Sequence, residues 1–268
     1  MIKFTYKKYK RVLLNQPIRN YLDVFNDDVF LVSYPRSGNT WLRFLLGSLI
    51  YKQQIDWNNF EQYVPDIYRN SNKELKRISR PRILKSHHSY DSRYNKVIYL
   101  VRDVRDVLVS YYKFHLKFKK IKKDYPLDTF IENFINGELD DFGTWKQNVE
   151  SWLKNKDEIK YGFLLIRYED LLQNTYSVVQ KIMDFLGYQR TDKEISNAIE
   201  WASFSNMRKL EDNQKNADIF EKSESNLKFT NKGTYGYWKD FLNQANLQIL
   251  ESYNKDLLVK LDYEIYTK

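Results

Sequence analysis

A turn of polar residues and glycine joins a short apolar strand to a helix in the first fifth of the chain. The apolar run ends at Tyr34, Pro35 stops it, and Arg36–Thr40 (RSGNT) leads into a helical pattern. In such a turn, backbone N–H groups and the positive end of the helix dipole converge on one point, which suits a bound phosphate. The GxxxxGK[ST] pattern of Walker A loops is absent. We therefore predict an anion site of another kind, with an ordinary strand-to-helix turn as the alternative.

A second apolar strand also runs directly into a helix, in the segment VIYLVRDVRDVLVSYY (97–112). Arg102 stands at the join, and Ser110 follows about two helical turns later. Ligands of α/β proteins bind at the carboxyl ends of parallel strands, where Arg102 would lie. The alternative is that Arg102, Asp103, Arg105 and Asp106 pair with one another at the surface, where ion pairs contribute little to stability.

The segment RILKSHHSYD carries two of the three histidines at the end of another apolar run. Lys85 and His87 would lie at the same edge of the sheet as Arg102. A histidine there is a candidate general base, because its pKa is close to physiological pH. A structural histidine is the alternative. No carboxylate or third histidine stands at ligand spacing from His87 and His88, so we predict no metal.

These residues need a sheet to position them, and four apolar runs predict its strands. The runs are Val29–Tyr34, Arg82–Ser86, Val97–Arg102 and Phe163–Tyr168. They are continuously apolar rather than alternating, which is typical of a parallel sheet covered on both faces.

Helical patterns alternate with the strands, which predicts an α/β fold with right-handed crossovers. The expected helices are Ser37–Lys52, Asp103–Phe118, Leu127–Ile135, Phe142–Asn155, Tyr176–Leu186, Asp192–Trp201 and Gln244–Leu261. The polar, weakly periodic stretch Glu211–Thr230 predicts a long loop. Neither a repeat nor a linker interrupts the chain, so we predict one domain over residues 1–268.

Composition narrows the function classes. The 268 residues carry 44 Lys plus Arg against 35 Asp plus Glu, a formal charge of +9, and no cysteine. The absence of cysteine excludes disulfide scaffolds, zinc ribbons and thiolate nucleophiles. The positive charge favours an anionic partner, such as nucleic acid, a membrane surface or a small phosphorylated or sulfated ligand; a solvated surface is the alternative. Neither a membrane span nor a signal peptide is recognisable, so we expect a cytoplasmic protein.

Six segments resemble, in order, the motifs of the PAPS-dependent sulfotransferases, where PAPS is 3′-phosphoadenosine 5′-phosphosulfate. In chain order they are YPRSGNTW (family form YPKSGTTW), LKSHHS (KTHLP), VIYLVRDVRDVLVSYYKF (the 3′-phosphate motif), FINGELDDFGTWKQNVESWL (FxxGxxxxGxWxxHVxxW), LIRYEDLLQN (YEDL) and NKGTYGYWKDFL (RKGxxGDWKxxF). They run from about Phe30 to Phe241. The resemblance implies a single α/β domain with a central, mostly parallel sheet flanked by helices, a sulfotransferase fold related to P-loop nucleotide kinases.

The resemblance also implies which residues bind the co-substrate PAPS. The turn would cradle the 5′-phosphosulfate, Trp41 would stack on adenine, and Arg102 with Ser110 would bind the 3′-phosphate that separates PAPS from ATP-like nucleotides. The full implied set is Arg36, Ser37, Gly38, Asn39, Thr40, Trp41, Arg102, Ser110, Tyr168, Phe204, Met207, Lys232 and Gly233.

The implied reaction is in-line transfer of the sulfuryl group to a hydroxyl or amine of an acceptor. His87 would take the acceptor proton. Lys85 and Arg36 would stabilise charge on the bridging oxygen as adenosine 3′,5′-bisphosphate leaves. These cations supply the field that a metal would otherwise supply, so the resemblance implies no metal.

Several positions depart from the family pattern. Arg36 replaces a lysine, and arginine is bulkier and prefers forked contacts. Ala202, Asn231 and His88 stand where the family has Thr, Arg and Leu. The family's dimer signature KxxxTVxxxE is matched only at Lys239, so the sequence does not predict an oligomeric state.

The acceptor pocket should come from segments without family motifs, and a small molecule, a glycan or a lipid would fit the family. The candidate segments are Met1–Asp28, Asp56–Lys76, Tyr112–Asp141 and Glu211–Thr230. We also expect Glu211–Thr230 to fold over the nucleotide. Basic residues at the N-terminus and in Lys117–Lys123 allow peripheral membrane contact. The alternatives are a PAPS-binding but catalytically weak member, a nucleotide kinase-like enzyme, or a nucleic-acid-binding module; we expect no nucleic acid.

Overall fold

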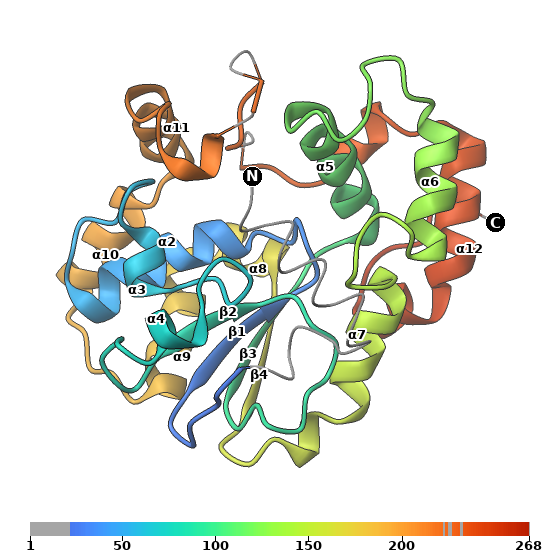
Figure 1. Cartoon of the computed structure of the whole chain (residues 1–268). Helices are drawn as coiled ribbons and strands as arrows, with labels where there is room; N and C mark the ends of the chain where they lie inside the picture. Colours follow the sequence, from blue (N-terminus) through green and yellow to red (C-terminus); the bar gives the residue numbers. More distant parts are fainter. Residues whose placement is uncertain (1–21, 222, 225–226, 231–232, 268) are drawn as a thin grey trace.

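Four parallel strands in the order β2–β1–β3–β4 form the centre of the molecule (Figure 1). The computed structural model describes residues 22–221, 223–224, 227–230 and 233–267. The strands are β1 (Val29–Ser33), β2 (Ile83–Ser86), β3 (Val97–Val101) and β4 (Phe163–Arg167). The predicted parallel sheet and its four strands are confirmed, and β1–β3 are buried throughout, as their continuous apolar character requires.

All seven predicted helices are present, with ends within three residues of the expected positions. They are α2 (Asn39–Tyr51), α5 (Val104–Lys117), α6 (Leu127–Asn136), α7 (Trp145–Lys154), α9 (Thr175–Leu186), α10 (Asp192–Trp201) and α12 (Gln244–Lys260). The sequence analysis missed α3 (Phe60–Tyr63), α4 (Asn72–Leu75), α8 (Tyr168–Gln173), α11 (Phe204–Asn213) and the 3₁₀ turns η2 (Lys156–Glu158), η3 (Asp218–Phe220) and η4 (Tyr237–Asp240).

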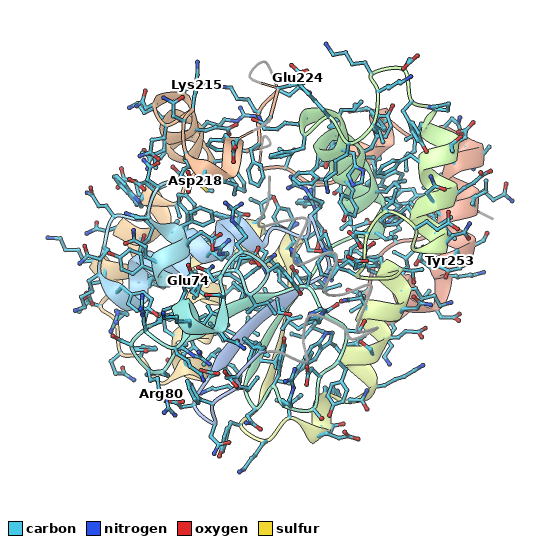
Figure 2. The ribbon with its side chains drawn as sticks, in the orientation of Figure 1. Glu74, Arg80, Lys215, Asp218, Glu224 and Tyr253 are labelled. Atoms are coloured by element: carbon cyan, nitrogen blue, oxygen red, sulfur yellow. The ribbon has the colours of Figure 1, made fainter. Side chains whose placement is uncertain are left out.

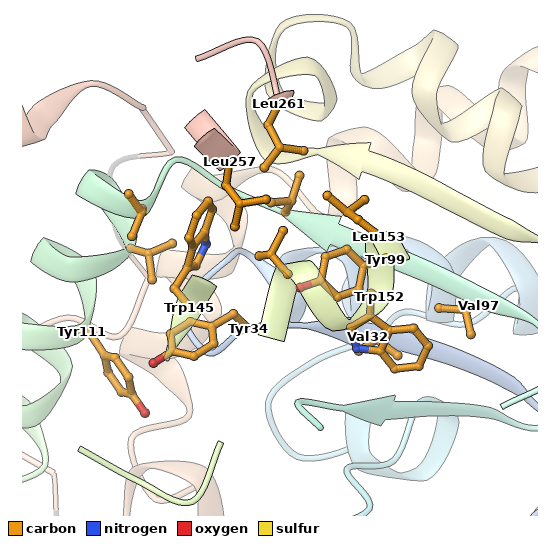
Figure 3. Close-up of a cluster of buried hydrophobic side chains, with 14 of the residues drawn as sticks. Val32, Tyr34, Val97, Tyr99, Tyr111, Trp145, Trp152, Leu153, Leu257 and Leu261 are labelled. Carbon is orange, nitrogen blue, oxygen red and sulfur yellow. The ribbon is translucent and has the colours of Figure 1, made fainter. Parts of the chain in front are cut away.

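Helices cover both faces of the sheet and bury one apolar core on each side. In Figure 1, α2, α3, α4, α9 and α10 lie to the left of the sheet, and α5, α6, α7 and α12 lie to the right. Figure 3 shows part of the right-hand core, where Tyr34, Tyr99, Trp145 and Trp152 pack together with leucines of α12. Because the strands lie between two packed layers, their carboxyl ends are fixed on both sides.

The predicted loop Glu211–Thr230 is wrong at its N-terminal end. Ser203 caps α11, accepting a hydrogen bond from the Asn206 N–H at 3.3 Å, and the helix continues through Glu211. The Glu211 side chain is buried, where it accepts hydrogen bonds from the backbone of Phe229 and Thr230. A polar residue satisfied by a distant part of the chain gives no periodic signal, so the helix was hidden.

The alternative of a surface cluster of ion pairs after β3 is also wrong. Arg102, Asp103, Arg105 and Asp106 are at most 6% exposed. Arg105 pairs with Asp103 at 2.7 Å and with Glu251 of α12 at 2.5 Å, because α12 and the segment after it cover this corner. Among the described residues, no helix is long and apolar enough to cross a membrane.

Candidate active site

The turn after β1 presents an uncapped helix N-terminus. Arg36 and Gly38 have φ of 69° and 100°, both in the left-handed region. A side chain at Gly38 would place its Cβ 2.5 Å from Tyr168 Cδ2, so both the conformation and the space require glycine. At this end of α2, no side chain caps the backbone N–H groups and the first turn holds no acidic residue. The turn therefore has the geometry of an anion site.

Two arginines and a serine converge on this turn from β1, β3 and α5. Arg36 Nε donates to Ser110 Oγ at 3.2 Å, and Arg102 Nη1 lies 3.5 Å from the Arg36 carbonyl oxygen. The Arg102 guanidinium lies 4.2 Å from the centroid of the Tyr168 ring and 3.7 Å from the Asp106 carboxylate. In the sheet, β2 lies beside β1 on one side and β4 lies beside β3 on the other, so the connections after β1 and β3 run in opposite directions. The cations thus lie where the connections diverge, the usual ligand crevice of such sheets.

Buried polar atoms at this turn lack hydrogen-bond partners. Among the described side chains, Ser37 Oγ and Arg102 Nε are buried and make no hydrogen bond. Burial, together with the nearby Arg102 cation, lowers the pKa of Arg36 to about 10, so its guanidinium stays charged at neutral pH. Unsatisfied buried donors are costly and call for an explanation. A bound anion would supply the acceptors that these donors lack.

An aromatic cluster adjoins the turn. The Trp41 ring lies 4.8 Å from that of Phe204 and 5.9 Å from that of Tyr168, measured between centroids. Met207 is buried next to them in the same core. A Cβ at Gly233 would lie 2.1 Å from Phe204 Cδ2, which places this glycine directly on the ring. Five predicted nucleotide contacts, spread along the sequence from Trp41 to Gly233, therefore lie close together.

Three predicted residues contribute differently. The Asn39 side chain points inward, donating to Ser33 Oγ at 3.1 Å, so only its backbone faces the anion site. Thr40 stands partly exposed in the first turn of α2. Lys232, like the departure at Asn231, lies outside the described residues. Most of the proposed N-terminal acceptor segment, residues 1–21, also lies outside them.

His87 follows β2 and is held by the backbone of β1. Its Nδ1 lies 2.7 Å from the Ser33 carbonyl oxygen, which can only accept, so Nδ1 carries the hydrogen and Nε2 is the basic nitrogen. Tyr68 and Asn148 fix the His87 backbone: the His87 N–H donates to Tyr68 Oη at 2.7 Å, and Asn148 Nδ2 donates to the His87 carbonyl oxygen at 2.9 Å. Burial, reinforced by Lys85, lowers the pKa of His87 well below 6.5. The imidazole is therefore neutral at pH 7.

Lys85 forms a buried ion pair that the sequence analysis did not foresee. Its Nζ donates to Asp66 Oδ2 at 2.8 Å, and the two side chains are only 8% and 12% exposed. Burial lowers the pKa of Lys85, although Asp66 opposes the shift. The Asp66 carboxylate is ionised, because Lys85 and Arg43 outweigh the effect of its burial and lower its pKa.

Further aromatic side chains belong to the site, of which the sequence analysis did not single out Phe142 and Phe229. Phe142 packs 5.4 Å from the His87 ring, and Tyr68 lies stacked at 6.2 Å, again between centroids. Phe229 lies 5.0 Å from the Arg36 guanidinium. Tyr68 belongs to the candidate acceptor segment Asp56–Lys76, whereas Trp57 and Phe60 of that segment are 2% exposed and belong to the core. In the described part of the chain, no three His, Asp or Glu side chains gather as a metal site would require.

The sulfotransferase domain family matches residues 26–262 of the chain. The chain belongs to the sulfotransferase family. It is 31% identical to mouse sulfotransferase 2A1 over 93% of this chain and 90% of that protein. It is also 31% identical to the guinea pig (Cavia porcellus) 3-beta-hydroxysteroid sulfotransferase, over 92% of this chain and 88% of that protein. The resemblance stated from its motifs is thus confirmed, as is its assignment to the sulfotransferase enzymes.

The sulfotransferase fold is also found by structural comparison. The crystal structure of mouse sulfotransferase SULT7A1 complexed with PAP superposes with a TM-score of 0.71 at 23% identity, over 89% of this chain and 88% of that one. The predicted fold class, a single α/β domain with a parallel sheet flanked by helices, is therefore confirmed.

Proposed function

We propose that the chain transfers the sulfuryl group of PAPS to a hydroxyl or amine of a small-molecule acceptor, with His87 as general base. The observation that carries this proposal is the convergence of Arg36, Ser37 and Arg102 on the uncapped end of α2. A neutral His87 lies at the same edge of the sheet. The structure of the mouse relative complexed with PAP supports the donor.

The residues present fit a nucleotide with phosphates at both ends. Ser37 Oγ and the N–H groups of the turn would bind the 5′-phosphosulfate. Arg102 Nε and Ser110 would bind the 3′-phosphate, a charge-assisted contact that ATP cannot make. Trp41, Tyr168 and Phe204 would hold the adenine. Arg36 lies between the residues assigned to the 5′-phosphosulfate and those assigned to the 3′-phosphate, because it belongs to the turn and its side chain contacts Ser110.

The chemistry follows from the protonation states. His87 Nε2 removes the acceptor O–H or N–H proton as the acceptor oxygen or nitrogen bonds to sulfur. The bond between sulfur and the bridging oxygen breaks, and its electron pair stays on the 5′-phosphate of adenosine 3′,5′-bisphosphate. Lys85 and Arg36 stabilise the negative charge that develops on that oxygen. Because His87 is neutral well below pH 7, the base is ready at physiological pH.

The surroundings of His87 favour an acceptor with an apolar ring or chain. Tyr68 and Phe142 flank the imidazole. Aromatic walls with a few polar groups are typical of small-molecule sites. The printed name of the guinea pig relative, a 3-beta-hydroxysteroid sulfotransferase, and that of a rabbit (Oryctolagus cuniculus) relative, an amine sulfotransferase 26% identical over 99% of this chain and 94% of that protein, agree with the two acceptor groups proposed here.

Nucleotide binding is tested by thermal unfolding with adenosine 3′,5′-bisphosphate and, separately, with ATP. At 100 times the dissociation constant, a ligand stabilises the folded state by about 2.7 kcal/mol. We expect this from the bisphosphate and not from ATP. Arg102→Gln should abolish the effect, and Arg80→Gln should preserve it, because Arg80 is exposed and pairs with the exposed Asp27. Stabilisation by ATP alone would instead indicate a nucleotide kinase-like enzyme.

Transfer is tested by incubating the chain with ³⁵S-labelled PAPS and a panel of phenols, steroid alcohols and aryl amines. We expect a labelled product from at least one class. His87→Ala should reduce turnover by about 10² to 10⁴-fold, while bisphosphate binding is retained. Unchanged turnover in His87→Ala would refute the base assignment. Binding without transfer to any acceptor would indicate a catalytically weak member of the family.

A further inference from the structure

Asp66 contacts the catalytic lysine from a segment that carries no family motif. It lies on a short stretch that runs beside β2: the Lys85 N–H donates to the Pro65 carbonyl oxygen at 2.9 Å, and the Ile67 N–H donates to the Lys85 carbonyl oxygen at 3.2 Å. These bonds on either side of Asp66 align its carboxylate with the Lys85 side chain. The ion pair is thus built into the backbone and does not depend on two flexible chains meeting by chance.

Both oxygens of the Asp66 carboxylate are committed. Oδ2 accepts from Lys85 Nζ at 2.8 Å, and Oδ1 accepts from the Tyr68 N–H, also at 2.8 Å. The same carboxylate therefore orients Lys85 and the residue whose hydroxyl group accepts from the His87 backbone. One carboxylate therefore contacts Lys85 directly and supports His87 through Tyr68.

A second layer fixes Asp66 to the nucleotide-binding helix. The Asp66 N–H donates to Glu61 Oε2 at 2.8 Å, and Glu61 Oε1 lies 2.9 Å from Nη2 of Arg43 on α2. Arg43 is buried and its Nε donates to the Val64 carbonyl oxygen at 2.7 Å. The chain of contacts runs from α2 through α3 to β2. A shift of α2 would therefore be transmitted to Lys85.

We propose that Asp66 is a positioning residue for transfer: it fixes the Lys85 ammonium beside His87 and supplies the counter-charge that lets a buried lysine remain a cation. A lysine ammonium has three N–H donors. Asp66 takes one, which leaves two for the oxygens of the reacting group. The Tyr68 ring, whose centroid lies 4.9 Å from Nζ, limits the other positions that the ammonium can adopt. This inference rests on the proposed function.

The charged groups around Lys85 determine what removal of Asp66 would do. They are Asp66 and Glu61, which favour the ammonium, and Arg43, which disfavours it; the neighbouring His87 is neutral, and Asp140, farther along the α6–α7 turn, also interacts with Lys85. Asp66 is the strongest of these groups, because it alone touches Nζ. Losing an opposite charge at such a distance lowers the pKa of a basic group by about 1 to 3 pH units.

Asp66→Asn tests the proposal through the pH profile. Transfer should require protonated Lys85, so the alkaline limb of kcat/KM should move down by about 1 to 3 pH units. The loss of activity should be much larger at pH 8.5 than at pH 6.5. Asp66→Glu keeps the charge and should keep the alkaline limb in place even if kcat falls. A uniform loss of activity at all pH values in Asp66→Asn would reduce Asp66 to a structural role and overturn the proposal.

Two further variants keep the test valid if Asp66→Asn folds poorly. Lys85→Arg carries a group that does not deprotonate in this range, so its alkaline limb should no longer depend on residue 66. Asp27→Asn removes an exposed carboxylate that also pairs with a cation, Arg80, and should leave the profile unchanged.

A measurement without donor or acceptor separates this inference from the proposed function. Lysines labelled with ¹³C at Cε report their protonation by NMR, and Lys85→Arg identifies the signal of Lys85. The pH midpoint of the Lys85 titration should fall in Asp66→Asn and stay unchanged in Asp66→Glu. An unchanged midpoint would overturn the proposal whatever the chain transfers. A shifted midpoint in a chain that transfers nothing would instead count against the proposed function.

Discussion

At the scale of single residues, Arg36 shows how an arginine is accommodated where related chains carry lysine. Its guanidinium lies 4.7 Å from the Phe114 centroid and 5.0 Å from the Phe229 centroid, while Nε donates to Ser110. A planar guanidinium can stack between two rings and still bond sideways, which an ammonium cannot. The substitution is therefore supported by its neighbours and is not a neutral exchange of one cation for another.

Arg36→Lys should lower turnover and nucleotide affinity even though it restores the usual family residue. The left-handed backbone at this position applies equally to both residue types, so the exchange tests the side chain alone. Each lost cation–π contact costs about 0.5 to 2 kcal/mol, so loss of both should reduce kcat/KM by about fivefold or more. The measurement is steady-state transfer together with bisphosphate titration. Arg190→Lys, at a guanidinium stacked on Tyr188 outside the site, is the matched control; equal activity of both variants would contradict this reading of Arg36.

The residues of the site differ in how far the sequence could predict them. The turn, Arg102, Ser110 and His87 stand at the ends of strands or at fixed helical spacing, so local pattern and family motif locate them. Asp66 acts through Lys85, 19 positions away, and through a backbone pairing of two short segments. No local pattern encodes such a pairing. The same holds for Glu211, whose partners Phe229 and Thr230 lie 18 and 19 positions later in the sequence.

At the scale of elements, β1, β2 and β3 were predictable because burial on both faces gives them a continuous apolar run, and the sequence of β4 is also continuously apolar up to Arg167 although its burial alternates. Helices with an apolar stripe were predictable because their apolar residues recur at the helical period. α8 was missed because it begins at Tyr168, immediately after β4, with no side-chain cap to mark its start. α11 was missed because its buried face includes the charged Glu211 alongside Met207.

The segment after α11 is tied to α5 by charge and hydrogen bonds. Buried Lys117, part of the basic run Lys117–Lys123 considered for membrane contact, donates to the carbonyl oxygens of Glu224 and Leu227 and lies 3.8 Å from Glu211. Figure 2 shows Lys215 and Asp218 beside α11 in the upper left of the view, and Glu224 between α11 and α5. Phe229, at the end of the segment, rests on Arg36. The segment is thus held against the anion site, as expected if it folds over the nucleotide.

Glu211→Gln should loosen this segment. Glutamine keeps one acceptor oxygen and loses the charge, so the backbone of Phe229 and Thr230 loses a bond worth about 1 to 3 kcal/mol to a charged partner. Trypsin should then cut faster at Lys215 or Lys228, and adenosine 3′,5′-bisphosphate should slow cleavage of the native chain. Glu200→Gln, at an exposed position on α10, should cut at the native rate. Cleavage of the native chain at the same rate with and without bisphosphate would count against closure over the nucleotide.

At the scale of the whole molecule, the residues of the site account for only part of the formal charge of +9. Lys85 and Arg102 are buried there and Arg36 is partly buried, but Lys85 is paired with Asp66 and Arg102 lies 3.7 Å from Asp106. Arg105, also buried near this edge, is paired with both Asp103 and Glu251. The site therefore contributes less net charge than its number of cations suggests. Much of the surplus belongs to exposed lysines such as Lys122 and Lys123, and such lysines would suit an acceptor that carries negative charge.

Buried charge also makes the stability of the whole domain depend on pH, and Asp140 gives a clear case. Burial raises the pKa of Asp140 from 3.8 to about 6, only partly offset by the Phe142 N–H that donates to Oδ1 at 2.8 Å; Oδ2 is buried without a hydrogen-bond partner. Because the folded pKa is raised, the folded chain keeps a proton between about pH 4 and 6 that the unfolded chain has lost. The contribution of Asp140 to stability is therefore greatest below pH 4 and is lost as pH rises through 6.

Asp140→Asn should remove this dependence, because an amide stays neutral at every pH. The variant should match the native chain near pH 4 and exceed its free energy of unfolding by about 2 to 3 kcal/mol at pH 7. Urea unfolding at pH 4, 5, 6 and 7 measures the difference, in which the titrations common to both chains cancel. Asp124→Asn, at an exposed carboxylate, should differ from native by a constant amount. A constant difference for Asp140→Asn as well would mean that water or a mobile neighbour already satisfies Oδ2 in solution, and that this carboxylate is ionised in the folded chain well below pH 6.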